Sequence, residues 1–266
     1  MSTSPSGPSP SRAGSAGDRA RLLARLLARL DAVDTAPGAA ALRRRSYTLL
    51  GLGPGVRFLD VGCGAGRAVG EAAALGARVV GLDRDEGMLA AARERLPGGA
   101  FTAGDATALP HDDGAFDAYR ADKVLHELAD PAVALAEARR VLAPGGRIVL
   151  TGQDWDTFVI DAADAALTRT LVHARADRVP SPRAARAFRA LLLDHGFRDV
   201  TVEVAIATFT EAPWLSLLTG LAEAAARCGA VTPAEAAAWT ADQRQRAATG
   251  RLFAAVPFFM AAATRG

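Results

Sequence analysis

The stretch that decides the fold reads Phe58-Leu59-Asp60-Val61-Gly62-Cys63-Gly64-Ala65-Gly66. Apolar residues lead into an acid and three alternate glycines, and a helix-like segment begins directly after them. This order predicts a β-strand, a tight loop and the N-terminus of a helix. Glycine lets the backbone approach a ligand closely and accepts positive φ angles. Such a loop, at the carboxyl end of the first parallel strand, is where open α/β sheets bind cofactors.

Strands and helices alternate downstream of this loop. The predicted strands are 78–82, 100–102, 116–119, 147–151 and 198–204, and the predicted helices are 67–75, 86–96 and 131–142. Such alternation is typical of a parallel sheet with right-handed crossovers. We therefore expect an α/β fold with a doubly wound, seven-stranded, mostly parallel sheet of Rossmann-like type.

The remaining segments suggest how the chain is divided. Residues 1–17 are rich in Ser, Pro and Gly and predict a disordered tail. Residues 18–55 predict N-terminal helices that form a lid or cap, the first with a leucine stripe that would pack on the domain. A membrane-surface or dimerising role for that helix is the alternative. The expected core covers 56–210, a helical insertion covers 211–250, and 251–266 form the closing strand.

Composition excludes several classes of function. The chain has 266 residues with 31 basic and 29 acidic side chains, which favours neither a nucleic-acid groove nor an anionic membrane as partner. Two cysteines without a CxxC motif argue against a disulfide framework or a zinc site. A secretory signal and a membrane-spanning apolar run are both missing, so we expect a cytoplasmic protein. The sequence has no recognisable set of metal ligands, so we expect no bound metal. Assembly as a homodimer is left open.

Three acidic residues follow three successive predicted strands. Asp60, Asp83 and Asp105 should therefore face a single crevice at one edge of the sheet. A nicotinamide cofactor is one interpretation, because Asp83 lies about twenty residues beyond the glycines. The glycine loop alone does not separate this interpretation from others.

Further motifs, in order along residues 56–204, together resemble the class I S-adenosylmethionine-dependent methyltransferases. They are the loop of residues 60–66, Gly81-Leu82-Asp83, Gly104-Asp105-Ala106, Phe116-Asp117 and Leu142-Ala143-Pro144-Gly145-Gly146-Arg147. The resemblance is strongest to the branch that acts on small molecules, including quinones and natural products. It implies S-adenosyl-L-methionine as the cofactor.

The resemblance also implies roles for individual residues. Asp83 would accept hydrogen bonds from the ribose hydroxyls, and Asp105 or the amide of Ala106 would bind the adenine edge. Arg120 departs from the family pattern, which has a small residue there, and would bind the cofactor carboxylate or an anionic substrate. The full expected cofactor set is Asp60, Gly62, Cys63, Gly64, Gly66, Asp83, Arg84, Asp105, Ala106 and Arg120.

His126 is the candidate general base because it follows the fourth strand, with packing or helix capping as the alternative. Tyr47, Trp155 and Phe158 are the candidate substrate contacts. The predicted function is methyl transfer to O, N or C of a small organic molecule in natural-product metabolism. The alternatives are a non-methylating reaction such as cyclisation, a nicotinamide-dependent oxidoreductase, and a non-catalytic binding protein.

Overall fold

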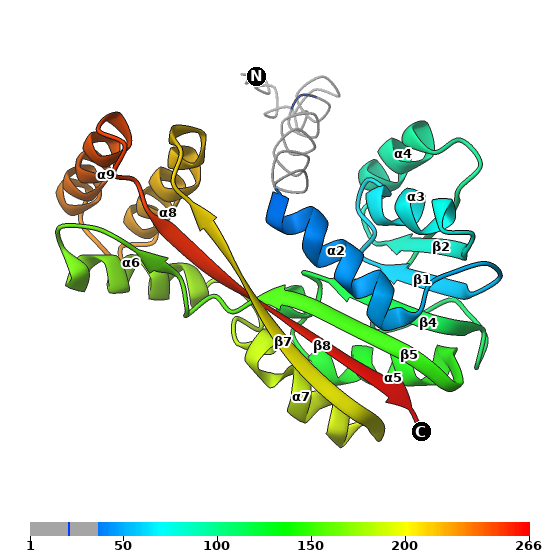
Figure 1. Cartoon of the computed structure of the whole chain (residues 1–266). Coiled ribbons are helices and arrows are strands. Elements are labelled where there is room, and N and C mark those ends of the chain that lie inside the picture. Colours follow the sequence, from blue (N-terminus) through cyan, green and yellow to red (C-terminus); the bar gives the residue numbers. More distant parts are fainter. Residues whose placement is uncertain (1–20, 22–36) are drawn as a thin grey trace, which may run out of the picture.

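The computed structural model describes Arg21 and residues 37–266. The predicted tail of residues 1–17 lies outside the described residues, as does all of the predicted first helix except Arg21. The described strands form one sheet in the order β3-β2-β1-β4-β5-β8-β6, with β7 paired to β8 (Figure 1). Their bounds are β1 Arg57–Val61, β2 Arg78–Asp83, β3 Ala100–Ala103, β4 Phe116–Asp122, β5 Leu142–Gln153, β6 Val159–Ile160, β7 Phe197–Phe209 and β8 Ala254–Arg265.

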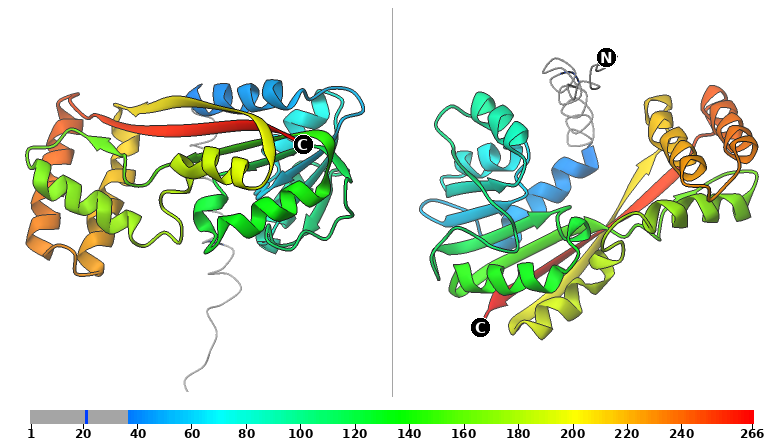
Figure 2. Two further views of the ribbon diagram at one scale, coloured as in Figure 1. Left: turned by 90° about the horizontal axis from the view of Figure 1, so that it is seen from below. Right: turned by 180° about the vertical axis from the view of Figure 1, so that it is seen from behind.

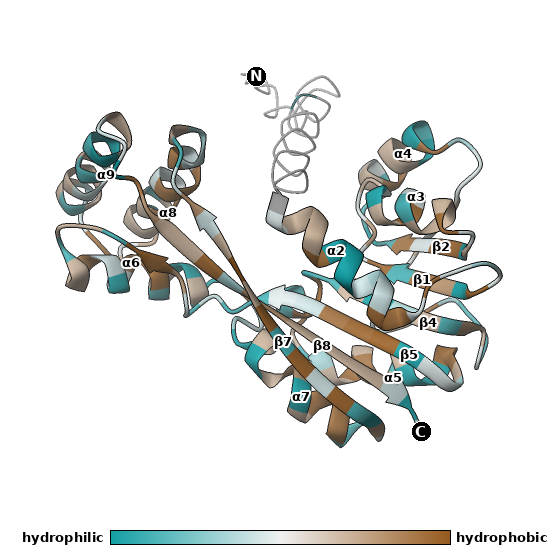
Figure 3. Cartoon of the chain, in the orientation of Figure 1, coloured by the Kyte–Doolittle hydropathy of each residue, from teal (hydrophilic) through white to brown (hydrophobic). Residues whose placement is uncertain are grey.

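The strands from β3 to β5 are parallel, so their carboxyl ends lie at the same edge of the sheet. Asp60 is level with Gly81 of β2 and with Arg120 of β4, and Asp83 is level with Ala103 of β3. These registers bring the ends of four strands together, as the sequence predicted. Hydrophobic residues dominate the middle of β5, where Ile148, Val149 and Leu150 are fully buried (Figure 3).

Helices cover both faces of the sheet. They are α2 Pro37–Leu50, α3 Arg67–Ala74, α4 Glu86–Arg95, α5 Pro131–Val141, α6 Ala165–Ala176, α7 Ala184–Asp194, α8 Leu215–Arg227 and α9 Pro233–Ala248, with short 3₁₀ helices η1 Leu125–Glu127 and η2 Ala212–Trp214. Helix α2 packs on one face and α5 and α7 on the other (Figure 2). Polar caps set several helix starts, including the Asp85 side chain on α4 and a Thr232–Glu235 capping box on α9.

Strand β8 is antiparallel and links the core to a separate group of helices. Its C-terminal half pairs with β5, its first residues pair with β6, and β7 follows it along most of its length. The β7–β8 ribbon thus extends beyond the parallel strands to α6, α8 and α9, which have their own hydrophobic core around Leu171, Leu221 and Trp239 (Figure 2).

The predicted fold class is confirmed, including the helical insertion before the last strand. Helices η2, α8 and α9 form this insertion between β7 and β8. The two-residue strand β6 adds an eighth strand to the seven expected, because two residues are too few to show a sequence pattern. None of the described helices is both long enough and apolar enough to cross a lipid bilayer.

Candidate functional site

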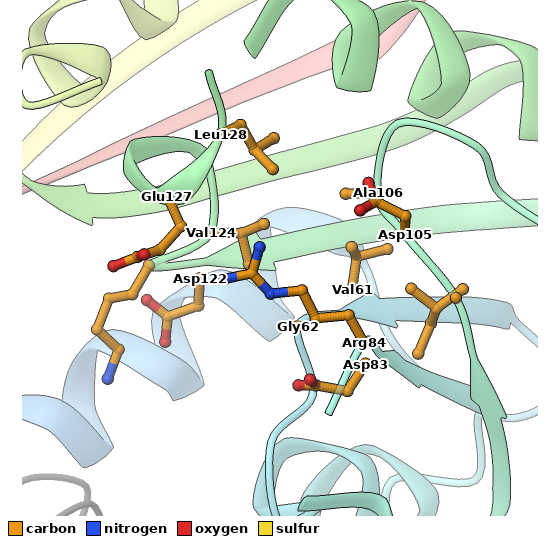
Figure 4. Close-up of a pocket in the computed structure, with 13 residues that line it drawn as sticks. Val61, Gly62, Asp83, Arg84, Asp105, Ala106, Asp122, Val124, Glu127 and Leu128 are labelled. Carbon is orange, nitrogen blue, oxygen red and sulfur yellow. The ribbon is translucent and has the colours of Figure 1, made fainter. Parts of the chain in front are cut away.

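A cavity of about 180 Å³ lies at the carboxyl ends of β1, β2 and β4 (Figure 4). Five of its lining residues belong to the predicted cofactor set, namely Gly62, Asp83, Arg84, Asp105 and Ala106. Five others follow the end of β4 or are its last residue, namely Asp122, Lys123, Val124, Glu127 and Leu128. This strand-end cavity therefore brings together residues that are far apart in the sequence.

The glycine loop between β1 and α3 is tightly packed at both ends, at Gly62 and Gly66, and open in the middle, at Gly64. Gly62, Gly64 and Gly66 have φ angles of 68°, 52° and 78°, which L side chains rarely adopt. A Cβ atom on Gly62 would lie 2.3 Å from Cγ2 of Val124, whereas one on Gly64 would meet nothing within 4 Å. Gly62 thus allows the loop to pack against Val124, the residue just before η1. Gly64 leaves open space beside the loop.

Asp83 ties the glycine loop to β2. Its Oδ2 accepts a hydrogen bond from the Gly64 amide at 2.8 Å, and its Oδ1 accepts one from the Asp85 amide at 3.0 Å. Carboxylate oxygens can accept further bonds, and the Asp83 side chain lines the cavity. Asp83 can therefore hold the loop in place and still accept a hydrogen bond from the hydroxyl group of a ligand.

Asp105 presents an exposed carboxylate at the same cavity. Its Oδ1 accepts hydrogen bonds from the amide and the hydroxyl of Thr107, at 2.8 and 2.6 Å. These bonds, with the nearby Arg84 charge, hold the pKa of Asp105 below its usual range, although partial burial opposes them. Asp105 is thus an ionised acceptor at neutral pH.

A buried ion-pair network lies beneath the loop. Arg120 donates to Asp60 Oδ1 at 2.8 Å, to Asp122 Oδ2 at 2.7 Å and to the Ser46 hydroxyl at 3.2 Å. Neither Asp60 nor Arg120 lines the strand-end cavity, whereas Asp122 does. Arg120 therefore connects α2, β1 and the end of β4 from below.

Three more of the predicted cofactor residues, Cys63, Gly64 and Gly66, also lie outside that lining. Cys63 is buried among Val69 and Leu89, and this burial raises the pKa of its thiol well above the usual range. The thiol is therefore neutral and unsuited to nucleophilic attack. Gly66 packs against Ala92 and Phe101, so its role in the described structure is to bring α3 close to α4.

Asp122 and Lys123 also line a second cavity, of about 440 Å³, between α2 and β7. Its walls include Leu42, Ile206 and Phe258, together with the polar residue Thr151. This α2–β7 cavity therefore adjoins the strand-end cavity at the end of β4 and combines apolar walls with polar groups.

The predicted substrate residues are separated in the structure. Trp155 and Phe158 stack with ring centroids 5.4 Å apart and line a third cavity, of about 460 Å³, against α8. Tyr47 lines none of the three cavities, since its hydroxyl donates to Glu71 Oε2 at 2.8 Å in a buried site. Burial raises the pKa of Tyr47, so its hydroxyl stays protonated.

His126, the predicted base, lines none of the three cavities, although its neighbour Glu127 lines the strand-end cavity and its ring partner Trp155 lines the α8 cavity. Its Nε2 is 3.2 Å from Glu127 Oε1, and its ring makes an edge contact with Trp155 at 5.4 Å. Burial lowers the pKa of His126 despite the opposing charge of Glu127. The ring is thus neutral near pH 7, the protonation state that a base requires.

The sequence analysis missed the role of Asp122 at this site. The signal was available, because Asp122 ends β4 just as Asp83 ends β2. Lys123 adopts a φ of 61°, which is uncommon for a residue other than glycine. No sequence pattern indicates that backbone angle. Within residues 37–266 there is no group of three or more His, Cys, Asp or Glu side chains placed to hold a metal ion.

Comparisons with known proteins agree on one family. Residues 59–150 match the family model described as a methyltransferase domain. The chain is 35% identical over 244 residues to an uncharacterized 37.1 kDa protein in transposon TN4556 of Streptomyces fradiae. This alignment covers 88% of this chain and 70% of the relative. It is also 42% identical over 108 residues to a demethylmenaquinone methyltransferase of Beutenbergia cavernae, and this alignment covers 41% of this chain and 45% of that protein.

A solved structure shows the same fold. The geranyl diphosphate C-methyltransferase from Streptomyces coelicolor A3(2), crystallised with S-adenosyl-L-homocysteine, superposes with a TM-score of 0.55 at 18% identity. The match covers 86% of this chain and 76% of that one. The chain spans less than half the length of the demethylmenaquinone methyltransferase that it matches.

Proposed function

Because the chain belongs to the class I S-adenosylmethionine-dependent methyltransferases, we propose that it transfers the methyl group of S-adenosyl-L-methionine to a small organic molecule. The observation that carries this proposal is that two cavities adjoin at Asp122 and Lys123. One has the acidic strand ends and the glycine loop expected of a donor site. The other has the size and apolar walls of a small-molecule site.

The strand-end cavity fits the cofactor on one specific point. Asp122 Oδ1 is buried and has no hydrogen-bond partner among the described residues. An unpaired buried carboxylate oxygen is costly, and a bound ammonium group would relieve that cost. The methionine part of the cofactor carries such an ammonium group, so the Asp122 carboxylate and the cofactor are complementary in charge.

Several residues would hold the cofactor. Asp83 would accept from the ribose hydroxyls, and Asp105 would accept from the adenine amino edge. The open side of Gly64 would accommodate the methionine part. Asp60 and Arg120 would act indirectly, because their contacts fix the loop and orient Asp122.

When bound, the cofactor supplies an electrophilic methyl group on a sulfonium. The residues of this chain contribute orientation and exclusion of water, which together account for about 7–11 kcal/mol in well-aligned reactions. A general base adds a factor of about 10² to 10⁴ where the acceptor is a hydroxyl. We retain His126 for this role, with Glu127 linking it to the strand-end cavity.

The α2–β7 cavity is the proposed acceptor site. Its Thr151 Oγ1 is buried without a hydrogen-bond partner among the described residues, so it would bind a polar group on the acceptor. Phenols and quinols are the first acceptors to test, because one relative bears the name demethylmenaquinone methyltransferase. Natural-product metabolism is the setting that we propose.

Transfer of a labelled methyl group tests the proposal. The purified chain is incubated with methyl-labelled S-adenosyl-L-methionine and a panel of phenols, amines and carboxylates, and labelled products are counted. Label in at least one acceptor class supports methyl transfer. Calorimetry with the cofactor and with NAD runs in parallel.

The same two measurements separate the alternatives. Binding of NAD alone would contradict the cofactor assignment and favour an oxidoreductase. Cofactor binding without label transfer to any acceptor would favour a non-methylating reaction or a binding protein.

A further inference from the structure

The α2–β7 cavity and the cavity against α8 meet at one side chain. Phe209, the last residue of β7, lines both. Its ring makes an edge contact with Trp214 at 4.7 Å, and Trp214 lines only the α2–β7 cavity. Each of the three cavities therefore shares a wall with the next, first through Asp122 and Lys123 and then through Phe209.

Polarity changes along this series. The α2–β7 cavity has polar walls where it adjoins the strand-end cavity, with Asp122, Lys123 and Thr151, and near Phe209 its lining combines the Trp214 ring with Thr208, Thr210 and Glu211. The α8 cavity beyond it is lined largely by apolar side chains, including Leu217, Leu221 and Val256. Three charged residues also line it: the Glu223 and Arg227 side chains are mostly exposed to solvent, and the Arg175 guanidinium lies 4.3 Å from the centroid of the Trp155 ring. A ligand that followed the series would be polar at one end and apolar at the other.

Helix α8 leaves room for the apolar end. Gly220 and Ala224 lie four residues apart, on the same side of the helix, and both line the α8 cavity. A Cβ atom on Gly220 would meet nothing within 4 Å. Apolar space at this wall is therefore unfilled even though a larger side chain would fit.

We propose that the acceptor is an elongated molecule whose polar reacting head lies beside Asp122 and whose apolar tail passes Phe209 into the α8 cavity. This inference rests on the proposed function, because it takes the strand-end cavity as the donor site. The tail lies along the β7–β8 ribbon, which is the element shared by the core and the outer helices. In this arrangement the outer helices, which the ribbon connects to the core, would determine how long an acceptor can bind at the site of methyl transfer.

Binding of 4-alkylphenols tests the tail site without requiring turnover. Dissociation constants of phenol, 4-butylphenol and 4-octylphenol are measured by calorimetry on the full chain saturated with S-adenosylhomocysteine. Each methylene moved from water into an apolar cavity raises affinity about fourfold. We expect 4-octylphenol to bind at least about tenfold more tightly than 4-butylphenol.

Two substitutions on α8 fill the proposed tail site. Gly220→Met and Ala224→Phe should each reduce the octyl-to-butyl affinity ratio to below about threefold and leave the 4-butylphenol constant within about twofold. Ala237→Met, at an exposed position of α9, is the matched control and should retain the wild-type ratio. Unchanged binding of S-adenosylhomocysteine shows that each variant is folded.

An octyl-to-butyl ratio near one in the wild-type chain would overturn the proposal. The proposal would also be overturned if Gly220→Met and Ala224→Phe had the same octyl-to-butyl affinity ratio as the control Ala237→Met. Neither outcome depends on label transfer, so failure of the tail site and failure of methyl transfer are observed separately.

Discussion

Arg120 Nη1 lies 2.8 Å from Asp60 Oδ1, and the two side chains are only 5% and 1% exposed. The same guanidinium pairs with Asp122. One buried cation therefore connects the strand that precedes the glycine loop with Asp122, which lines both the strand-end cavity and the α2–β7 cavity. Its loss would leave two buried carboxylates without a cation.

Removal of this cation should destabilise the fold. Arg120→Met is expected to lower the free energy of unfolding by about 3–5 kcal/mol, because it leaves the buried Asp60 carboxyl without its charged partner. Urea denaturation measures the effect. Arg93→Met, which breaks an exposed pair with Glu86, should change stability by less than about 1 kcal/mol. Equal effects of the two variants would show that the buried network does not stabilise the fold.

The two loop glycines should respond differently to alanine. Both Gly62→Ala and Gly64→Ala place a Cβ at positive φ, at a cost of about 1–2 kcal/mol. Gly62→Ala adds a clash with Val124, for about 1–3 kcal/mol more. Urea denaturation of both single variants and of Gly62→Ala with Val124→Ala measures the difference. Failure of the Val124 substitution to recover part of the loss would contradict the packing argument.

Asp83 should contribute to cofactor affinity. Asp83→Ala removes the acceptor of the Gly64 amide bond and the proposed partner of the ribose hydroxyls. We expect the dissociation constant of S-adenosylhomocysteine to rise at least about tenfold, since a bond to a charged group contributes about 1.5–3 kcal/mol. Calorimetry provides the measurement, with the exposed Glu94→Gln on α4 as the control. A constant within twofold of wild type would exclude a cofactor role.

His126 should make stability depend on pH. Burial places its pKa in the folded chain below the 6.5 of an exposed imidazole. As pH falls below about 6.5, the unfolded chain binds a proton at His126 that the folded chain does not, so the free energy of unfolding decreases. The slope reaches at most about 1.4 kcal/mol per pH unit.

His126→Phe should remove that contribution and preserve an aromatic contact with Trp155. Denaturation at pH 5, 6 and 7 gives the slope for both proteins. The pKa of His111 is also lowered by burial, so the informative quantity is the difference between wild type and variant. Parallel slopes would show that His126 takes up its proton equally in the folded and unfolded chains.

A base at His126 predicts a distinct kinetic result. His126→Ala should leave the cofactor dissociation constant within about threefold and lower kcat for a phenol by about 10² to 10⁴. The loss should shrink near pH 10, where a phenol ionises by itself. Single-turnover assays across pH check this, with Trp155→Phe as the control for lost packing. An unchanged kcat, or a loss independent of pH, would leave His126 a purely structural role.

The alternation of elements from residue 57 to residue 151 could be predicted from the sequence, because strand and helix patterns are local. The shared position of Asp83 and Asp105 followed from it, since parallel strands end at one edge of a sheet. Arg120 was harder to place. Its position after the fourth strand indicated the site, but only the packed structure shows that its donors are engaged by Asp60, Asp122 and Ser46.

The sequence by itself determined the sheet, the glycine loop and the acidic strand ends, and the resemblance of these motifs to the methyltransferase family indicated the methyl donor. The tertiary structure decided which side chains share a cavity. Trp155 and Phe158 line the α8 cavity rather than the strand-end cavity, and Phe209 lines both the α8 cavity and the α2–β7 cavity. These contacts depend on how the β7–β8 ribbon positions the outer helices, and long-range packing of this kind has no signature in local sequence.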